Sequence, residues 1–322
     1  MRHRPIASLL VAVLTAGCSV ISLDLSPKIR PLTEETVEGK HGPKILLMDI
    51  SGMLSDEGTQ PILNLGNTPA RVPMLVRVRE ELKKAEDDKQ VRALIVRINS
   101  PGGTVTASDI MYREILSFKE RTRRPVVAVM MDVAASGGYY LALAADTIIA
   151  HPTTVTGSIG TIMLSVNAEG LMQKIGVAAI TIKSAEHKDM GSPFRTLTAE
   201  ERAMFQSVID ELQRQFLAKV VAHRKLAPET ARKLADGRVY TADQALAHGL
   251  VDKIGYMSDA VATAKQAAGL DDARVIVYHR PRQYRATYYA RADETPVASA
   301  DALSGMASLA ASGPRFLFLW WP

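Results

Sequence analysis

The sequence predicts an α/β fold built around a mainly parallel sheet. Short apolar runs rich in β-branched residues alternate with amphipathic stretches of helical period along the chain. This order of strand, helix, strand and helix favours parallel pairing of the strands, with helices packed on the faces of the sheet. The chain has 322 residues, of which 47% are hydrophobic, so it can bury the core of one large domain or two modest ones.

The expected elements follow one another in a regular order. A buried strand at 45–50 begins the folded part, and apolar positions such as Val78 and Leu82 mark an amphipathic helix over 73–88. The elements expected after it are a strand at 92–98, a helix over 107–121, a strand at 125–130, a short helix over 140–145, apolar stretches at 147–150 and 161–164, a strand at 178–182 and a long helix over 199–223.

Residues 1–17 are predicted to be a signal peptide of the lipoprotein type. Arg2 and Arg4 form a short basic region, and the apolar region over 6–14 is too short to span a bilayer as a helix. Small residues then precede Cys18, a pattern that resembles the lipobox of bacterial lipoproteins, in which the cysteine is lipidated. A lipidated Cys18 would tether the protein to the periplasmic or outer side of a membrane in the bacterial cell envelope. The alternative is an ordinary secretory signal, in which Cys18 is an incidental buried thiol.

Three regions are expected after the signal peptide. Residues 18–43 are polar, contain three prolines and show no periodicity, which predicts a linker. The folded domain is expected over 44–280, and residues 281–322 are expected to form a C-terminal tail. The aromatic segment at 316–322 would suit either a membrane interface or a groove on a neighbouring subunit.

Composition excludes several classes of site. The net charge is only +5, from 39 Lys and Arg against 34 Asp and Glu, and no basic block stands out in the body, so nucleic-acid binding is not indicated. A single cysteine permits neither an intrachain disulfide nor a cysteine-based metal cage. The seven histidines are scattered without metal-ligand spacing. We therefore expect neither a metal site nor a cofactor.

Ser136 is the leading candidate for a nucleophile. It lies where the strand at 125–130 has ended and a helix begins, and the N–H of Gly137 could stabilise an oxyanion that develops beside it. A second donor could come from Gly103, because the Pro-Gly-Gly turn places bare N–H groups at the carboxyl end of the preceding strand. Taken alone, Ser136 could equally be a helix N-cap and the glycines an ordinary turn.

Five motifs in order give the sequence a resemblance to a known family. Over residues 44–270 the chain resembles the signal peptide peptidase A family of serine–lysine peptidases, in its short, single-copy form. The family has a crotonase-like fold shared with the Clp peptidase, built of repeated β-β-α units with a mainly parallel sheet. It cleaves peptides in membranes or the cell envelope, notably signal peptides left after export. The motifs are those at 99–103, 132–140, 152–160, 187–193 and, as a pair, 235–240 with 249–252.

The resemblance assigns roles to individual residues. It implies Ser136 as nucleophile, Lys188 as general base and Ser158 as the group that orients the Lys188 amine, with Gly103 and Gly137 forming the oxyanion hole. A lysine acts as a base only if burial lowers its pKa from about 10.4 toward neutrality. A histidine triad is the rival within the same fold.

That rival would use the neighbours of Lys188 in the sequence. His187 and Asp189 flank it, and Clp-type relatives use a Ser-His-Asp triad. The surrounding Lys-Asp-Met-Gly-Ser-Pro sequence, however, matches the lysine-using members, which favours Lys188 as the base.

The resemblance also bears on assembly and function. The short form builds a ring-shaped homo-oligomer in which serine and lysine meet across a subunit boundary. The expected function is that of an envelope serine endopeptidase that uses a Ser-Lys dyad on signal-peptide remnants and other unfolded apolar peptides. Two alternatives are a catalytically silent envelope scaffold of the same fold and an acyl-CoA enzyme of the crotonase type. Export from the cytoplasm and the pairing of Ser136 with Lys188 disfavour the acyl-CoA enzyme.

Overall fold

The computed structural model describes residues 31–56, 72–281, 287–289 and 315–320. The predicted signal peptide and the lipidation site Cys18 lie outside these residues. In the part of the chain that is described, no helix is both long and apolar enough to cross a membrane.

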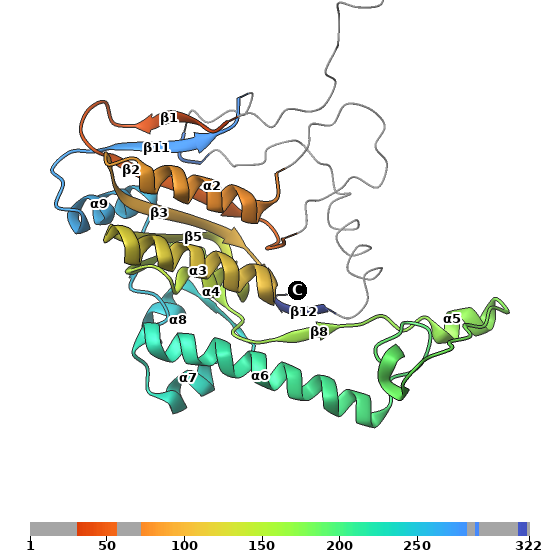
Figure 1. Cartoon of the computed structure of the whole chain (residues 1–322). Helices are drawn as coiled ribbons and strands as arrows, with labels where there is room; N and C mark the ends of the chain where they lie inside the picture. The colour runs from red at the N-terminus through yellow and green to blue at the C-terminus, as the bar shows by residue number, and fades with distance from the viewer. Residues whose placement is uncertain (1–30, 57–71, 282–286, 290–314, 321–322) are drawn as a thin grey trace, which may run out of the picture.

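The predicted parallel sheet forms the centre of the molecule (Figure 1). Its neighbouring strands follow the order β1-β11-β2-β3-β5-β6-β10, and every pair from β11 to β10 is parallel, whereas β1 pairs with β11 in antiparallel fashion. The end of β5 also pairs with β7, which in turn pairs with β9. The strands are β1 (Thr33–Glu38), β2 (Lys44–Ser51), β3 (Val91–Ser100), β5 (Val126–Ala135), β6 (Thr147–Ala150), β7 (Val155–Gly157), β9 (Val239–Thr241), β10 (Lys253–Ile254) and β11 (Arg274–His279).

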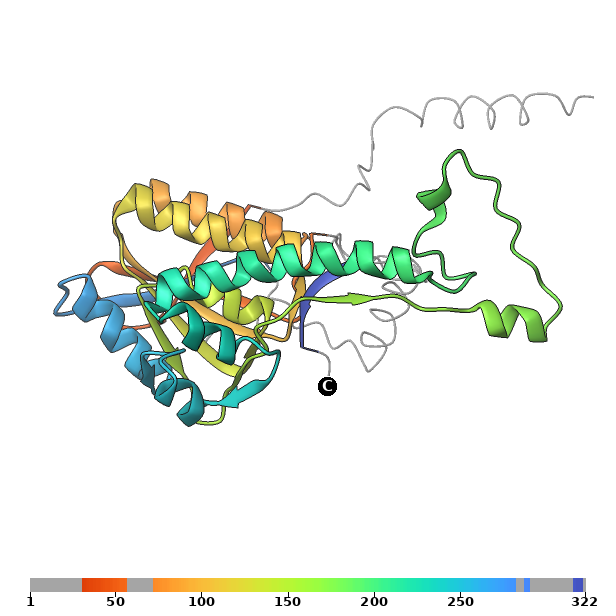
Figure 2. The same cartoon turned by 90° about the horizontal axis from the view of Figure 1, so that it is seen from below.

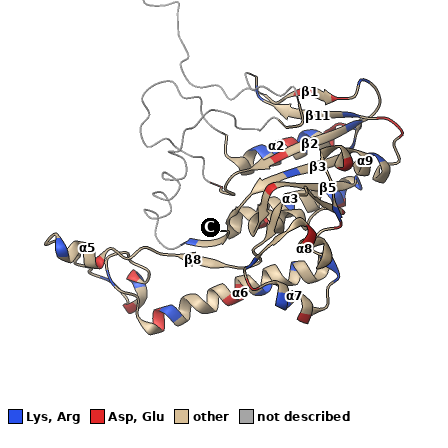
Figure 3. Ribbon diagram, turned by 180° about the vertical axis from the view of Figure 1, so that it is seen from behind, with Lys and Arg blue, Asp and Glu red and all other residues tan. Residues whose placement is uncertain are grey.

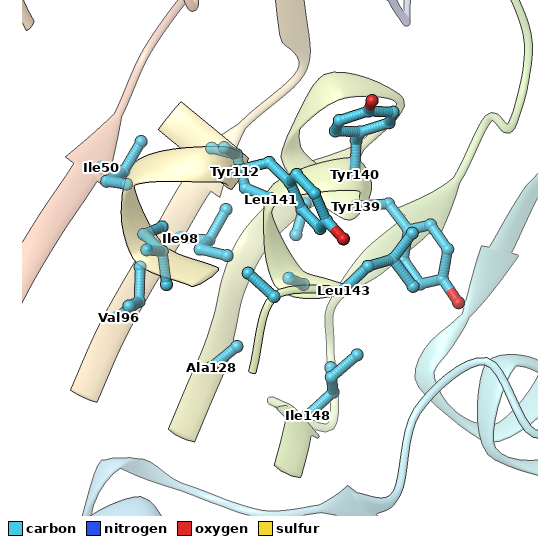
Figure 4. Packing of buried hydrophobic residues seen from close by; sticks show 14 of the residues in the cluster. Ile50, Val96, Ile98, Tyr112, Ala128, Tyr139, Tyr140, Leu141, Leu143 and Ile148 are labelled. Atoms are coloured by element: carbon cyan, nitrogen blue, oxygen red, sulfur yellow. The ribbon is translucent and has the colours of Figure 1, made fainter. Parts of the chain in front are cut away.

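Helices cover both faces of this sheet. Successive side chains of a strand point to opposite faces, so Leu46 of β2 packs toward one layer of helices and Ile45 toward the other. Figure 4 shows the packing on the first face. The first face is covered by α2 (Met74–Asp87), α3 (Val105–Thr122), α4 (Gly137–Ala142) and α6 (Ala199–Arg224), and the second by α9 (Met257–Ala267).

Local sequence signals explain where the principal helices begin. The Thr104 hydroxyl accepts a hydrogen bond from the Ala107 N–H at 3.2 Å and so caps α3. Thr198 and Glu201 form a reciprocal capping box at the start of α6. Two shorter helices, α7 (Pro228–Leu234) and α8 (Ala242–Ala247), follow α6.

A small second sheet lies at the carboxyl end of the central strands. It has the order β4-β12-β8, from Gly102–Thr104, Arg315–Leu319 and Ile162–Leu164, and both pairings are antiparallel. The unit β3-β4-α3 has the β-β-α order that the resemblance implies. The described part of the aromatic C-terminal segment thus pairs inside its own chain as β12. The membrane interface and the groove on a neighbouring subunit that the sequence suggested stay predictions.

An extended segment separates β8 from α6. Residues 165–197, which we call the arm, contain α5 (Glu169–Lys174) and the 3-10 helix η1 (Glu186–Asp189), and the arm projects away from the body (Figure 2). The strand predicted at 178–182 is wrong: no described strand pairs with it, and Ile180 and Ile182 are 87% and 97% exposed. Because no described partner strand lies beside residues 178–182, their backbone groups cannot form the interstrand hydrogen bonds of a sheet.

The rest of the element order is confirmed, but the domain boundaries were drawn too narrowly. β1 lies within the predicted linker and β12 within the predicted tail, and both pair with strands of the folded body. The motif at 152–160 includes the short strand β7.

Candidate active site

Ser136 occupies a strained junction between β5 and α4. Its backbone has φ 52° and ψ −114°, a region that non-glycine residues rarely adopt. The Ser136 N–H donates to the Gly157 carbonyl at 2.7 Å, and the Ser136 carbonyl accepts from the Tyr140 N–H at 2.9 Å. Ser136 is therefore held by its backbone on both sides, which fixes the direction of its side chain.

The Ser136 hydroxyl itself has no hydrogen-bond partner among the described residues, although it is fully buried. A buried, unpaired hydroxyl costs about 1–3 kcal/mol. Ser136 does not act as a helix cap, since its side chain bonds to no N–H of α4. The strained backbone and the unpaired buried hydroxyl of Ser136 both lower stability, so a role in catalysis explains them better than a structural role.

Ser158 lies beside Ser136 because of strand register. β5 and β7 are parallel, and Ala135 is paired with Gly157, so the two serines each follow the last paired residue of their strand. Ser158 also has a positive φ of 49°, is 7% exposed, and donates its N–H to the Arg238 carbonyl at 2.7 Å. The two hydroxyl-bearing residues end neighbouring strands at the same level.

The glycine turn after β3 lies against the start of α4. Gly102 has φ 104°, and a Cβ built on it would lie 2.8 Å from the Gly137 nitrogen and 1.9 Å from the Phe318 carbonyl oxygen. A Cβ on Gly137 would in turn lie 3.1 Å from the Gly102 Cα. The absence of both side chains therefore allows the glycine turn and the start of α4 to touch.

Gly102 and Gly103 differ in their hydrogen bonding. The Gly102 N–H donates to the Ser100 hydroxyl at 3.1 Å. Gly103 is paired with Phe318 of β12 across the antiparallel strands and forms an isolated bridge with Leu54. The sequence made Gly103 the candidate for the second oxyanion donor. In this structure the edge of β4, the strand that contains Gly103, is paired with β12.

Alanine at position 102 is expected to be strongly destabilising. A side chain at this φ costs about 1–3 kcal/mol in backbone strain alone, and its Cβ would overlap the Phe318 carbonyl. We expect Gly102→Ala to lower the free energy of unfolding by at least about 2 kcal/mol in urea denaturation. Gly170→Ala is the matched control, because nothing lies within 4 Å of its position on α5. Equal stability of the two variants would contradict this packing.

Lys188 does not reach Ser136 within the chain. It lies in η1 on the arm, its side chain is exposed, and no hydrogen bond joins it to Ser136 or Ser158 among the described residues. Figures 1 and 2 show η1 on the arm, away from α4. The structure thus brings Ser136, Ser158 and the glycine turn together, and leaves Lys188 apart from them.

The histidine alternative gains no geometric support. Asp189 is engaged by Arg195 and Lys183, each at 2.8 Å. The nearest acid to the His187 ring that forms an ion pair is Glu200, at 3.9 Å. His187 and Asp189 therefore do not form the His–Asp pair that a Ser-His-Asp triad requires.

An ion cluster fixes η1 to the start of α6. Arg195 binds Asp189 at 2.8 Å and Glu201 through a second, 2.5 Å contact, and Glu201 also accepts from the Thr198 N–H. Acidic and basic residues lie side by side in this part of the ribbon (Figure 3). Hydrogen bonds from Arg195 and the Thr198 backbone lower the pKa of Glu201 to about 2, and those from Arg195 and Lys183 hold the pKa of Asp189 well below its usual range.

The cluster predicts a pH-dependent effect of Arg195. Since both acids have lowered pKa values when folded, their stabilising contribution is complete above their ordinary values of 3.8 and 4.5. The contribution decreases progressively as the pH falls below these values, and that of Glu201 is lost as the pH falls through about 2. Arg195→Met should therefore lower the midpoint of thermal unfolding at pH 7, and the difference from the wild type should shrink by pH 3.

The exposed pair of Arg214 with Glu211 on α6 supplies the control for this prediction. Arg214→Met should change the midpoint little at either pH, because exposed ion pairs contribute little. A deficit of Arg195→Met that is equally large at pH 3 and pH 7 would show that ionisation of the acids is not its cause.

Sequence reasoning missed several residues that shape the site. Ser100 accepts from Gly102, Leu54 packs on Gly103 and Gly137, and Arg195 anchors the helix that carries Lys188. Only the position of Ser100 beside the glycine turn gave a signal in the sequence. The contacts of Leu54 and Arg195 depend on the tertiary structure, and no local sequence pattern predicts them.

Comparison with known proteins relates the chain to peptidases. A family model described as Peptidase family S49 matches residues 119–271. An Enterococcus faecium protein assigned as signal peptide peptidase SppA is 35% identical over 248 residues, which cover 77% of this chain and 70% of that protein. Serine protease SPPA of the Arabidopsis thaliana chloroplast is 37% identical over 205 residues, or 63% of this chain and 30% of that protein.

The structural comparison gives a more distant match. A mutant of ClpP1 from Listeria monocytogenes shows 17% sequence identity and a TM-score of 0.42, and the match covers 67% of this chain and 94% of that chain.

Proposed function

Because the chain belongs to peptidase family S49 and is a serine-type peptidase of the signal peptide peptidase kind, we propose that it cleaves unfolded apolar peptides with Ser136 as nucleophile and Lys188 as general base. The observation that carries this proposal is the Ser136 hydroxyl, which is buried, unpaired and held at a strained junction beside Gly137. No other described serine combines a positive φ with an unpaired buried hydroxyl.

The proposed reaction is acyl transfer in two steps. The Ser136 Oγ attacks the peptide carbonyl carbon while the neutral Lys188 Nζ accepts the hydroxyl proton. The oxyanion is stabilised by the Gly137 N–H together with the Gly103 N–H of the opposite turn. Collapse of the tetrahedral intermediate breaks the C–N bond, and the leaving amine takes the proton from Lys188. Water, deprotonated by the same lysine, then attacks the acyl carbon. The bond from that carbon to the Ser136 Oγ breaks, and Lys188 returns the proton to Oγ.

Lys188 is proposed to reach the Ser136 of a neighbouring copy. Within its own chain it lies on the exposed arm, and Ile180 and Ile182 of the same arm are 87% and 97% exposed. Large apolar side chains left in solvent on one segment mark a surface that another molecule covers. Burial against a second copy would also exclude water from the lysine amine, as its role as a base requires. A homo-oligomer with shared sites, as in a ring, satisfies both requirements.

The proposed location is the bacterial cell envelope. A lipidated Cys18 would tether the folded domain to a membrane, and the signal peptide remnants released there are apolar peptides of the kind that the proposed site would take. Ser158, which ends the strand next to that of Ser136, would orient the Lys188 amine by a hydrogen bond.

Cleavage of an unfolded protein tests the proposed function. The purified full chain in detergent should degrade casein, and should leave a folded protein of similar size intact. Its native mass, measured in parallel, should be a multiple of the mass of one chain, which is 35.0 kDa before the signal peptide is removed. If an oligomer of confirmed mass cleaves no unfolded protein, the proposal fails and a scaffold that retains the fold becomes the better interpretation.

A further inference from the structure

A cavity of about 500 Å³ lies at the end of the central sheet that is opposite to Ser136. It is lined by the loops that join β1 to β2, α2 to β3, and α9 to β11. Because β11, β2, β3 and β5 are parallel, these loops lie at the amino ends of the strands that they enter. Ser136 follows the carboxyl end of β5. The cavity is therefore separate from the candidate active site.

Basic side chains dominate the lining of this cavity, which we call the basic cavity. Five of its eight lining residues are Lys, Arg or His, and none is acidic. Lys and Arg lie on the loop after β1 and at the adjacent starts of β2 and β11 (Figure 3). Like charges that are brought together repel one another, so a bound anion would stabilise this arrangement. The five basic residues are Lys40, His41, Lys89, Arg92 and Arg274.

The basic side chains of the cavity have no acidic partner. None of the five forms an ion pair with any residue that the structure describes. Arg274 donates to the amide oxygen of Gln90, which also lines the cavity, at 3.1 Å. This hydrogen bond fixes the direction of the guanidinium group without neutralising its charge.

The acids that lie nearest to these residues in the sequence are bound elsewhere. Lys83 binds Asp87 and Lys44 binds Asp88, each at 2.8 Å. On the loop before β11, the carboxylate of Asp272 accepts the N–H of the next residue at 2.8 Å. These acids therefore do not pair with the basic side chains of the cavity.

Backbone packing holds the loop between β1 and β2 in place. Gly39 and Gly42 have φ values of 79° and 90°, and a Cβ on Gly39 would lie 2.6 Å from the Ala273 carbonyl oxygen. The N–H groups of residues 40–42 donate no hydrogen bond to the residues that the structure describes. The loop thus places unpaired N–H groups and basic side chains in the same lining, a combination that is typical of anion-binding loops.

We propose that the basic cavity binds a phosphate-bearing anion. Phosphate oxygens are strong hydrogen-bond acceptors, and Lys, Arg and backbone N–H groups are their usual partners in proteins. The volume of the cavity lies in the range of small-ligand pockets. An anionic phospholipid headgroup and a free polyphosphate both have this chemistry. The site shares no residue with the candidate active site, so the inference does not depend on the proposed peptidase function.

Amide hydrogen exchange of the full chain in detergent tests where the anion binds. Inorganic pyrophosphate should slow exchange at 39–42 and 88–92 at least about threefold once most sites are occupied. Exchange at 136–142, at the other end of the sheet, should not change. Sodium chloride at the same ionic strength is the reference, because it screens charges without supplying phosphate. Equal slowing by sodium chloride would overturn the proposal.

Charge reversal on two of the loops tests the lining itself. Lys40→Glu and Lys89→Glu should each weaken pyrophosphate binding, measured by calorimetry, at least about tenfold, because each replaces an attraction by a repulsion. Both lysines are exposed, so the variants should keep the thermal stability of the wild type. Lys233→Glu on α7 is the matched control, since Lys233 is also exposed and lies outside the cavity. An equal loss of affinity in Lys233→Glu would show that net charge alone attracts the anion, and would overturn the proposal.

Vesicles distinguish the two sources of the phosphate group. The full chain is reconstituted in vesicles of phosphatidylcholine alone or of phosphatidylcholine mixed with anionic phosphatidylglycerol, and exchange at 39–42 and 88–92 is compared. Slower exchange in the mixed vesicles, lost in Lys89→Glu, would assign the cavity to a lipid headgroup. Slower exchange with pyrophosphate only would assign it to a free phosphate compound. The proposal is wrong if neither ligand slows exchange at these segments, or if Lys89→Glu responds as the wild type does.

Discussion

Replacement of Ser136 by alanine is expected to lower kcat for casein cleavage by at least about a thousandfold, because the attacking atom is removed and no other group can replace it. The variant should remain as stable as the wild type, or become more stable. The Ser136 hydroxyl has no partner to lose, and its burial without a hydrogen bond is itself unfavourable. Cleavage kinetics and thermal denaturation, measured on the same preparation, check both parts.

A serine far from the site provides the control for this result. Ser207 lies on α6, is exposed, and donates only to the Met204 carbonyl at 2.7 Å. Ser207→Ala should retain wild-type kcat. Retention of cleavage by Ser136→Ala would exclude Ser136 as the nucleophile, whereas loss of activity together with a large fall in stability would indicate a folding defect.

Replacement of Lys188 by alanine is expected to have an effect of similar size, because it removes the proposed base for the Ser136 proton. His187→Ala, one residue away, should remain active, because the structure gives His187 neither a contact with Ser136 nor a pairing with Asp189. Comparison of kcat for the two variants distinguishes the lysine base from the histidine triad. The opposite pattern, with His187 essential and Lys188 dispensable, would move the site to the triad.

Mixing the two inactive variants tests whether copies share a site. In a ring, each site would take Ser136 from one copy and Lys188 from the next. If Ser136→Ala and Lys188→Ala chains are unfolded together in equal amounts and reassembled, about a quarter of the sites would contain both intact residues. Partial recovery of casein cleavage is the expected result. No recovery in an oligomer that contains both chains would place serine and lysine in the same chain.

The sequence by itself determined the layered architecture and the position of the candidate nucleophile, Ser136. Apolar periodicity is a local property, so the strands β2, β3 and β5 and the helices α2, α3 and α6 lie close to where the pattern predicted them. Ser136 stood out for a similar reason, because it is followed by two glycines and lies between the apolar run at 125–130 and a helical stretch, which marks a strand-to-helix junction. The family motifs then implied chemistry at that point.

Only the tertiary structure decided which segments meet at that junction. It paired β1 and β12 with the body, left 178–182 without a neighbour, and placed Gly102 against Gly137. The reason is that a segment forms a stable β-strand only when it can hydrogen-bond to the edge of another strand. That edge comes from a distant part of the chain. The same limit applies to Lys188, whose chemistry depends on what buries the arm. Local pattern and the family motifs named the candidate reacting groups, and long-range packing decided which of these residues lie together within the chain.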